Sequence, residues 1–160
     1  MMKPISVWKQ ELSGGAHAAR LAALYCCAPE QTPAQAARYE AVLDGLEATF
    51  GPHAEAGLYS APGRTEIGGN HTDHQHGRVL AGSVNIDMIA AAGPNTLGQL
   101  RVQSEGYDLC VIDLNDLAAR KEEENTSAAI LRGECEAFRQ RGAKLSGLDV
   151  YISSNVPKGS

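Results

Sequence analysis

The sequence lacks several features that would define a function class at once. Aromatic residues make up 5% of the 160 residues, and no apolar run reaches the length of a membrane-spanning helix. The start has no apolar signal-peptide core, and the cysteines form no CxxC pair, which excludes zinc-ribbon and thioredoxin-like motifs. With 14 basic and 19 acidic residues the net charge is -5, a poor balance for a general nucleic-acid binder. We therefore expect a cytoplasmic protein with reduced thiols and with neither membrane nor nucleic-acid partners.

The first third of the chain carries helical patterns. Residues 16–27 are rich in Ala and Leu and stop before Pro29, which cannot continue a helix. The tetrapeptide that begins at Thr32 has the order of a helix start: a capping hydroxyl, a proline at the first helical position and a glutamine three residues after the cap. Apolar spacing then predicts a helix that ends at Phe50. We expect residues 1–56 to form a helical segment.

Strand patterns dominate the rest of the chain. They lie at 58–62, 79–92, 100–103, 109–113 and 148–152. In the second pattern, alternation places Val84, Ile86, Met88 and Ala90 on one apolar face.

One more helix is expected between the last two strands, from about Thr126 to Arg141. The charged run at 121–124 before it is typical of a solvated face or loop. The order of the expected elements predicts an α+β fold with one sheet. This order is two helices, a group of strands, a helix and a final strand.

The stretch from 62 to 80 concentrates polar side chains among glycines. It contains Arg64, Glu66, Asn70, His71 and Asp73. Such groups hydrogen-bond a polyhydroxylated ligand well, and an arginine adds a fixed positive charge for an oxyanion or a phosphoryl group. On composition alone, a solvated loop and a ligand site are equally good interpretations.

A metal site is an alternative for the same stretch. His71, Asp73, His74 and His76 form a dense group of possible ligands. However, no histidine follows His76, and zinc catalysis needs three well-placed ligands and an open position. We therefore expect no metal site, and a metal-dependent hydrolase is the third-ranked function.

The same stretch resembles the galactokinase signature G-R-x-N-x-I-G-x-H-T-D. Without a gap, the matching residues are Gly63, Arg64, Gly69, His71, Thr72 and Asp73. The family's G-x-V-L continuation is found at 77–80. The resemblance covers the chain from about Trp8 to its end and is most specific at 58–82.

This resemblance implies a GHMP-type sugar kinase, which transfers a phosphoryl group from ATP, with magnesium, to the anomeric hydroxyl of galactose or a related sugar. The implied fold is an α+β N-lobe similar to ribosomal protein S5 domain 2, covering 57–160 incompletely. Arg64 would lie by the anomeric oxygen, and His71 and Asp73 would hold sugar hydroxyls. The ATP loop would begin at Gly159 and Ser160, so we expect a truncated, inactive piece of a longer enzyme.

Three positions depart from the family pattern. Glu66 stands where the family has Asn, Asn70 where it has Glu, and His74 where it has an aromatic residue. Glu66 and Asn70 are candidate sugar-binding residues that bear on which sugar is bound. A non-catalytic, galactokinase-like sugar sensor is the second-ranked function. The sequence does not define the oligomeric state.

Overall fold

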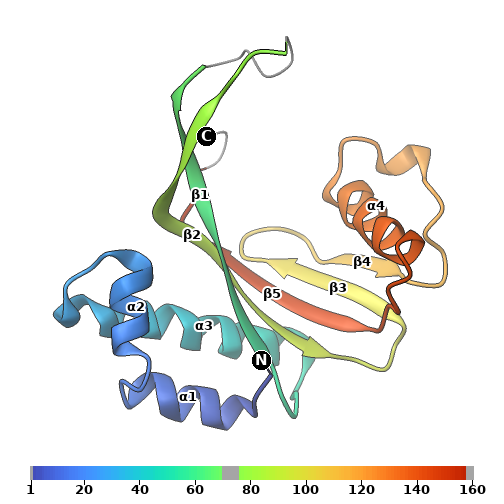
Figure 1. Cartoon of the computed structure of the whole chain (residues 1–160). Coiled ribbons are helices and arrows are strands. Elements are labelled where there is room, and N and C mark those ends of the chain that lie inside the picture. The colour runs from blue at the N-terminus through green and yellow to red at the C-terminus, as the bar shows by residue number, and fades with distance from the viewer. Residues whose placement is uncertain (1, 70–75, 158–160) are drawn as a thin grey trace.

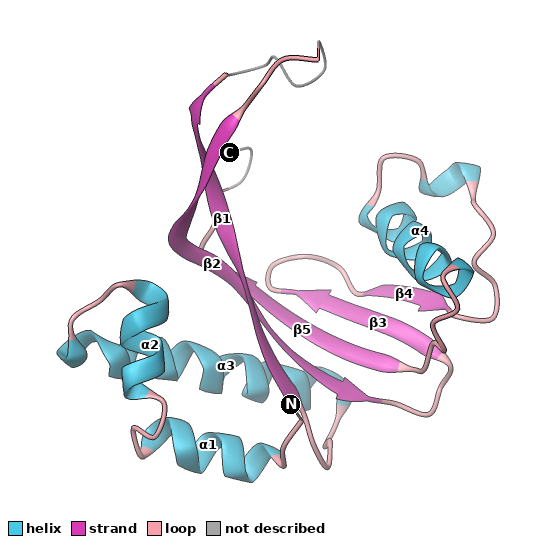
Figure 2. Cartoon of the chain, in the orientation of Figure 1, coloured by secondary structure: helices cyan, strands magenta, loops and turns pink. Residues whose placement is uncertain are grey.

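The structure is a computed structural model of the chain, and it describes residues 2–69 and 76–157. In this part of the chain, helices lie on both sides of one mixed sheet (Figures 1 and 2). The expected α+β fold is confirmed. No helix in the described ranges is long and apolar enough to cross a membrane.

The N-terminal helices pack around the longest of them. They are α1 (Ile5–Ser13), α2 (Ala18–Tyr25) and α3 (Thr32–Phe50). The α3 helix was predicted, α2 is shorter than its pattern, and α1 was not predicted. Thr32 lies inside the first turn rather than before it, and its hydroxyl donates to the Pro29 carbonyl at 2.8 Å.

The five strands of the described chain are joined in the order β1-β2-β5-β3-β4. They are β1 (Gly57–Gly68), β2 (Leu80–Pro94), β3 (Gln99–Ser104), β4 (Cys110–Asp113) and β5 (Leu148–Ser154). All neighbours pair antiparallel except β3 and β5, which pair in parallel. The last of the described strands thus occupies the middle of the sheet.

Two hydrophobic cores lie on opposite faces of this sheet. The larger core joins α1, α2 and α3 to β2, where Ile89 is fully buried. The smaller core holds Ile112 of β4 beneath α4 (Ser127–Gln140). The Arg101 guanidinium lies 4.8 Å from the ring of Phe50 in α3, whereas the adjacent Leu100 packs into the α4 core. Because successive strand residues point to opposite faces, α3 and α4 cover different sides of the sheet.

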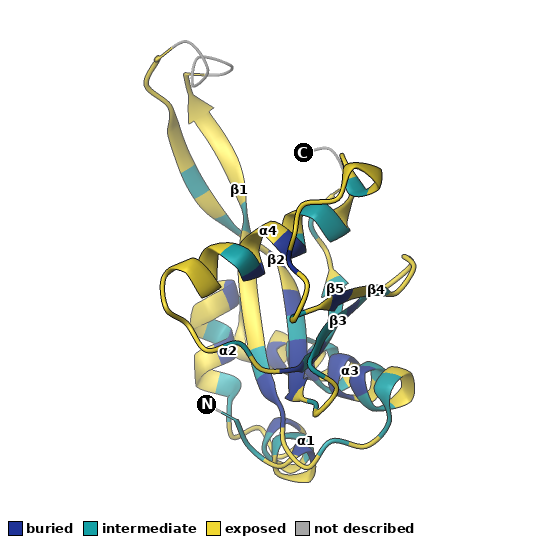
Figure 3. Ribbon diagram, turned by 90° about the vertical axis from the view of Figure 1, so that its right-hand side faces the viewer, coloured by how far each residue is buried: buried dark blue, intermediate teal, exposed yellow. Residues whose placement is uncertain are grey.

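The apolar face expected for β2 is not the buried one. Asp87, Ile89 and Ala91 are buried, whereas Ile86 and Met88 are 40% and 42% exposed. Both faces of this strand carry apolar residues, so alternation alone could not show which face the N-terminal helices cover. Figure 3 shows the mixture of buried and exposed positions along the strand.

The charged run at 121–124 was expected to be a solvated face or loop, but part of it forms a turn that contacts α4. It forms a 3-10 turn, η3 (Lys121–Glu123), before α4. Arg132, only 3% exposed, donates from Nε and a terminal nitrogen to the Glu123 carboxylate at 2.7 and 2.6 Å. This ion pair holds the pKa of Glu123 below its usual range. One residue of the run is therefore an anchor for α4.

Candidate functional site

Beyond the helices, β1 and β2 continue as a two-stranded arm that projects from the body (Figures 1 and 3). The arm comprises residues 63–68 of β1 and 80–86 of β2, and most of its side chains are exposed. The first strand was expected to end at 62, before the polar stretch. This was wrong for Gly63 to Gly68, which belong to β1. Polar residues between glycines lack the apolar alternation that identifies a strand.

Two of the predicted site residues lie on this arm. Arg64 is paired with Ser83, and Glu66 with Ala81. The two side chains are two residues apart in one strand, so they leave the same side of it. Both are exposed, and neither makes a side-chain hydrogen bond or ion pair with any other residue in the described ranges. The arm therefore exposes a positive and a negative group on one side of β1.

The remaining predicted site residues cannot be compared with their expected roles. Asn70, His71 and Asp73 lie outside the described residues, as do Gly159 and Ser160. Within residues 2–69 and 76–157 there is no cluster of three or more side chains suited to hold a metal ion. His74 also lies outside the described residues.

The backbone conformation at position 69 favours a glycine, and Gly69 of the signature stands there. Its φ is +87°, a conformation that residues with a Cβ rarely adopt. A Cβ placed there would collide with the carbonyl oxygen of Arg78, on the other side of the arm. The close approach of the two segments thus explains why a glycine stands at this position.

The other signature glycine, Gly63, lies where the arm leaves the body. The register shifts here, because β1 advances from Pro62 to Arg64 while β2 moves from Asp87 to Ser83. A Cβ on Gly63 would lie 3.3 Å from Cγ2 of Val156, in the segment after β5. The start of the signature and the segment after the last strand therefore meet, although they are more than ninety residues apart.

A buried carboxylate fixes this junction. Asp87 is 2% exposed and accepts hydrogen bonds from the hydroxyls of Tyr25 and Ser60, both at 2.6 Å, and from Arg38 at 2.8 Å. Tyr25 and Tyr39 also share a hydrogen bond of 2.9 Å between their hydroxyls. These contacts tie α2, α3 and β1 to one point of β2.

The charge state of this junction follows from its partners. Burial alone would raise the pKa of Asp87, but hydrogen bonds from Ser60, Tyr25 and Arg38 outweigh it and lower that pKa. Burial and the hydrogen bond to Asp87 raise the pKa of Tyr25. Asp87 is thus ionised and Tyr25 protonated at neutral pH.

The segment after β5 joins the same junction. The backbone N–H of Asn155 donates to the carbonyl oxygen of Asp87 at 3.0 Å. With its amide oxygen turned toward Arg38, Asn155 also accepts from Nε and a terminal nitrogen of that guanidinium at 3.2 Å. This junction was not predicted from the sequence. Its signal was the charged residue Asp87 in a mainly apolar strand.

Comparison with solved structures identifies the class of fold. The chain superposes on the crystal structure of Lactococcus lactis galactokinase complexed with galactose, with a TM-score of 0.63 and 21% identity over 72% of this chain and 30% of that one. It also superposes on Methanococcus jannaschii mevalonate kinase, with a TM-score of 0.53 and 11% identity over 68% of this chain and 35% of that one. The fold is therefore that of the GHMP kinases.

Sequence comparison narrows the class to one family. The family description "Galactokinase galactose-binding signature" matches residues 46–94. The chain is 34% identical to Streptomyces coelicolor galactokinase over 106 residues, which is 65% of this chain and 27% of that protein. It is 31% identical to Ligilactobacillus salivarius galactokinase over 123 residues, 74% of this chain and 31% of that protein. The chain belongs to the galactokinase family and spans less than a third of the length of these relatives.

Proposed function

We propose that the protein acts as a galactokinase-type sugar kinase, and that this chain supplies the part that holds the sugar. The match of residues 46–94 to the galactose-binding signature carries the proposal. The matched range includes Arg64, Glu66 and the run from Asn70 to Asp73. In this proposal, residues 57–160 are an incomplete N-lobe, and residues 1–56 are a helical segment preceding it.

Arg64 is the proposed catalytic residue. Phosphoryl transfer to a sugar hydroxyl depends mainly on positioning and on neutralising charge at the attacking and leaving oxygens. The exposed Arg64 guanidinium is not bound to a carboxylate of any described residue, so its charge is available to an anomeric oxygen. The ladder partner Ser83 fixes its place along the arm.

Asn70, His71 and Asp73 are the proposed contacts to sugar hydroxyls. Asp73 accepts hydrogen bonds from hydroxyls, whereas Asn70 and His71 can both donate and accept. Glu66 is the proposed source of the carboxylate that the family pattern has at position 70. Support for this role comes from its place beside Arg64 on the same exposed side of β1. Together these residues would define the sugar that is accepted.

ATP and magnesium are the proposed cofactors. ATP supplies the phosphoryl group and magnesium neutralises its charge. Gly159 and Ser160 are proposed to begin the phosphate-binding loop. Because relatives extend over three times the matched length, we further propose that this chain alone does not turn over ATP. Its proposed setting is the cytoplasm, with a small sugar as its partner and no nucleic acid.

A sugar sensor without catalysis is the second candidate. The observation that favours it is the change of three signature positions, where Glu66, Asn70 and His74 replace the family residues. A sensor and a kinase would both bind the sugar at this site, but only the kinase would transfer a phosphoryl group to it.

Calorimetric titration of galactose tests the shared site. The chain should bind galactose, and Arg64→Gln should weaken binding at least about tenfold, a loss of about 1.4 kcal/mol. Arg141→Gln is the matched control, because Arg141 is an exposed arginine beyond α4. Equal galactose affinity in the Arg64 variant and the control would remove Arg64 from the site.

Measuring ADP release separates the kinase from the sensor. The full gene product should release ADP from ATP only when galactose is present, and the 160-residue chain should release none. Galactose binding without ADP release by the full product would favour the sensor. Release by the chain alone would contradict the proposal that it is inactive.

A further inference from the structure

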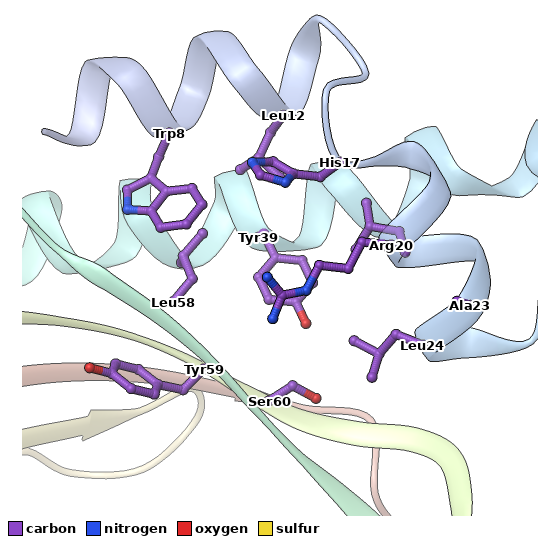
Figure 4. Close-up of a pocket in the computed structure, with 11 residues that line it drawn as sticks. Trp8, Leu12, His17, Arg20, Ala23, Leu24, Tyr39, Leu58, Tyr59 and Ser60 are labelled. Atoms are coloured by element: carbon purple, nitrogen blue, oxygen red, sulfur yellow. The ribbon is translucent and has the colours of Figure 1, made fainter. Parts of the chain in front are cut away.

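An open cavity lies beside the inner part of β1, away from the arm. It has a volume of about 540 Å³ and is lined by residues of α1, α2, α3 and β1 (Figure 4). Its volume lies within the range of roughly 300–1,000 Å³ typical of small-molecule pockets. Three lining residues, Leu58, Tyr59 and Ser60, fall within the matched range 46–94. Neither Arg64 nor Glu66, the proposed sugar-site residues that the structure describes, lines the cavity.

The walls of the cavity are mainly apolar. They include Trp8, Leu12, Leu21, Leu24, Tyr39 and Leu58. Leu24 is 48% exposed although it faces the other apolar walls. A bound apolar group would therefore remove apolar surface of both partners from water, which is favourable.

One cation reaches into this apolar space. Figure 4 shows Arg20 extending from α2 across the cavity toward Tyr39. Its guanidinium makes no hydrogen bond or ion pair with any other residue in the described ranges, and no Asp or Glu lines the cavity. The positive charge of Arg20 is thus not balanced within the cavity.

Two carboxylates that contact lining residues are already paired with cations. Glu11 pairs with Lys3 at 2.6 Å and with the ring of His17 at 2.8 Å. Asp87, which accepts from the lining residue Ser60, is paired with Arg38 at 2.8 Å. Neither acid compensates Arg20, so the cavity favours an anion.

We propose that this cavity binds a small amphipathic monocarboxylate, with an aliphatic or aromatic body. The body would lie against Trp8, Leu24 and Leu58, and the carboxylate would pair with Arg20. The fork of a guanidinium matches the two oxygens of a carboxylate, and such charge-assisted hydrogen bonds are about twice as strong as neutral ones. One unpaired cation above an apolar wall fits one anionic group, and a polyanion such as a nucleotide would leave charge unmatched.

Trp8 provides a direct readout, because it is the single tryptophan of the sequence and lines the cavity. Octanoate, octanol and octylamine have the same chain length and differ in charge. Octanoate should change Trp8 fluorescence saturably, with a dissociation constant at least about tenfold below that of octanol. Octylamine should bind more weakly than either. No saturable response to octanoate, or equal affinity for octanoate and octanol, would overturn the proposal.

Two variants and a control complete the test. Arg20→Gln should bring the affinities for octanoate and octanol together, while Leu24→Gln should weaken both and keep their ratio. Both sites are exposed, so circular dichroism should show an unchanged fold. Arg141→Gln, outside the cavity, should behave as the unaltered chain. Retention of the full preference for octanoate in the Arg20 variant would also overturn the proposal.

Discussion

The two halves of the long β1–β2 pair are both antiparallel, but their side chains have very different surroundings. In the inner half, under the N-terminal helices, Ile89 and Ala91 are fully buried. In the arm, Ile67 and Leu80 are 66% and 62% exposed. Apolar burial and buried hydrogen bonds supply most of the stability of a fold, so the inner half should determine stability and the arm ligand binding. Substitutions that affect both properties equally would contradict this division.

The largest effect on stability is expected at Asp87 in the inner half. Asp87→Ala would leave Arg38, Tyr25 and Ser60 without their shared acceptor. Loss of one partner of a buried ion pair typically lowers the free energy of unfolding by about 3–5 kcal/mol. Urea unfolding measures this, with Asp108→Ala, at an exposed aspartate, as the control. A loss no larger than that of the control would show that the junction does not support the body.

Acid should weaken the body by a smaller amount. The second buried carboxylate, Asp149, is 1% exposed and accepts hydrogen bonds from Arg101, Asn95 and His53. Burial alone would raise its pKa, but these hydrogen bonds outweigh burial and lower it, as at Asp87.

Because both folded-state pKa values lie below the unfolded value of about 3.9, their stabilisation is complete above that value and is lost as pH falls through the folded-state values. The urea concentration at the midpoint of unfolding should therefore decrease as the pH is lowered below about 5. This decrease should be smaller in Asp149→Asn. The effect is smaller than that of Asp87→Ala because a protonated carboxyl leaves no cavity and still forms hydrogen bonds. An identical pH dependence in Asp149→Asn would contradict this account.

A substitution at Gly69, at the end of the arm, should change the local backbone geometry with little effect on the stability of the whole fold. Gly69→Ala introduces a Cβ at φ +87° against the Arg78 carbonyl, a strain of about 1–3 kcal/mol. Gly68→Ala is the matched control, because nothing lies within 4 Å of its Cβ position. We expect Gly69→Ala to weaken galactose binding with a shift in the urea midpoint well below that of Asp87→Ala. A large loss of body stability would show that arm and body are coupled.

The smallest effect on stability is expected at Arg64. Arg64→Gln should change the free energy of unfolding by less than about 0.5 kcal/mol, because exposed side chains without partners contribute little. The same substitution should give the loss of galactose affinity described above. Urea unfolding and calorimetry on one preparation would compare the two properties directly.

Local signals explain which elements the sequence could predict. The α3 helix has a proline in its first turn and buried Val42, Leu43 and Leu46 at helical spacing, so its bounds were found closely. The short α1 buries only Ile5 and Leu12 among its described residues, too few for a period to be recognised. The arm lacks an alternating pattern because most of its side chains are exposed on both faces, so neither face packs against a core.

Contacts between distant segments explain what the sequence could not predict. The ion pair of Arg38 with Asp87 joins residues 49 positions apart, and the contact of Gly63 with Val156 crosses most of the chain. Nothing in either local pattern selects its partner. The signature motif indicated the family and made Arg64 a candidate site residue. The contacts of the junction around Asp87 could be found only in the structure.

The central position of β5 has a consequence for the order of assembly. The β1–β2 and β3–β4 pairs are each hairpins of neighbouring segments, but they share no ladder with each other and meet only through β5. Of the described strands, β5 is also the last to be synthesised, after α4. Before β5 is synthesised, no described strand pairs with both hairpins. The parallel closure of β3 on β5 is the late, high-contact-order step that turns two hairpins into a single sheet.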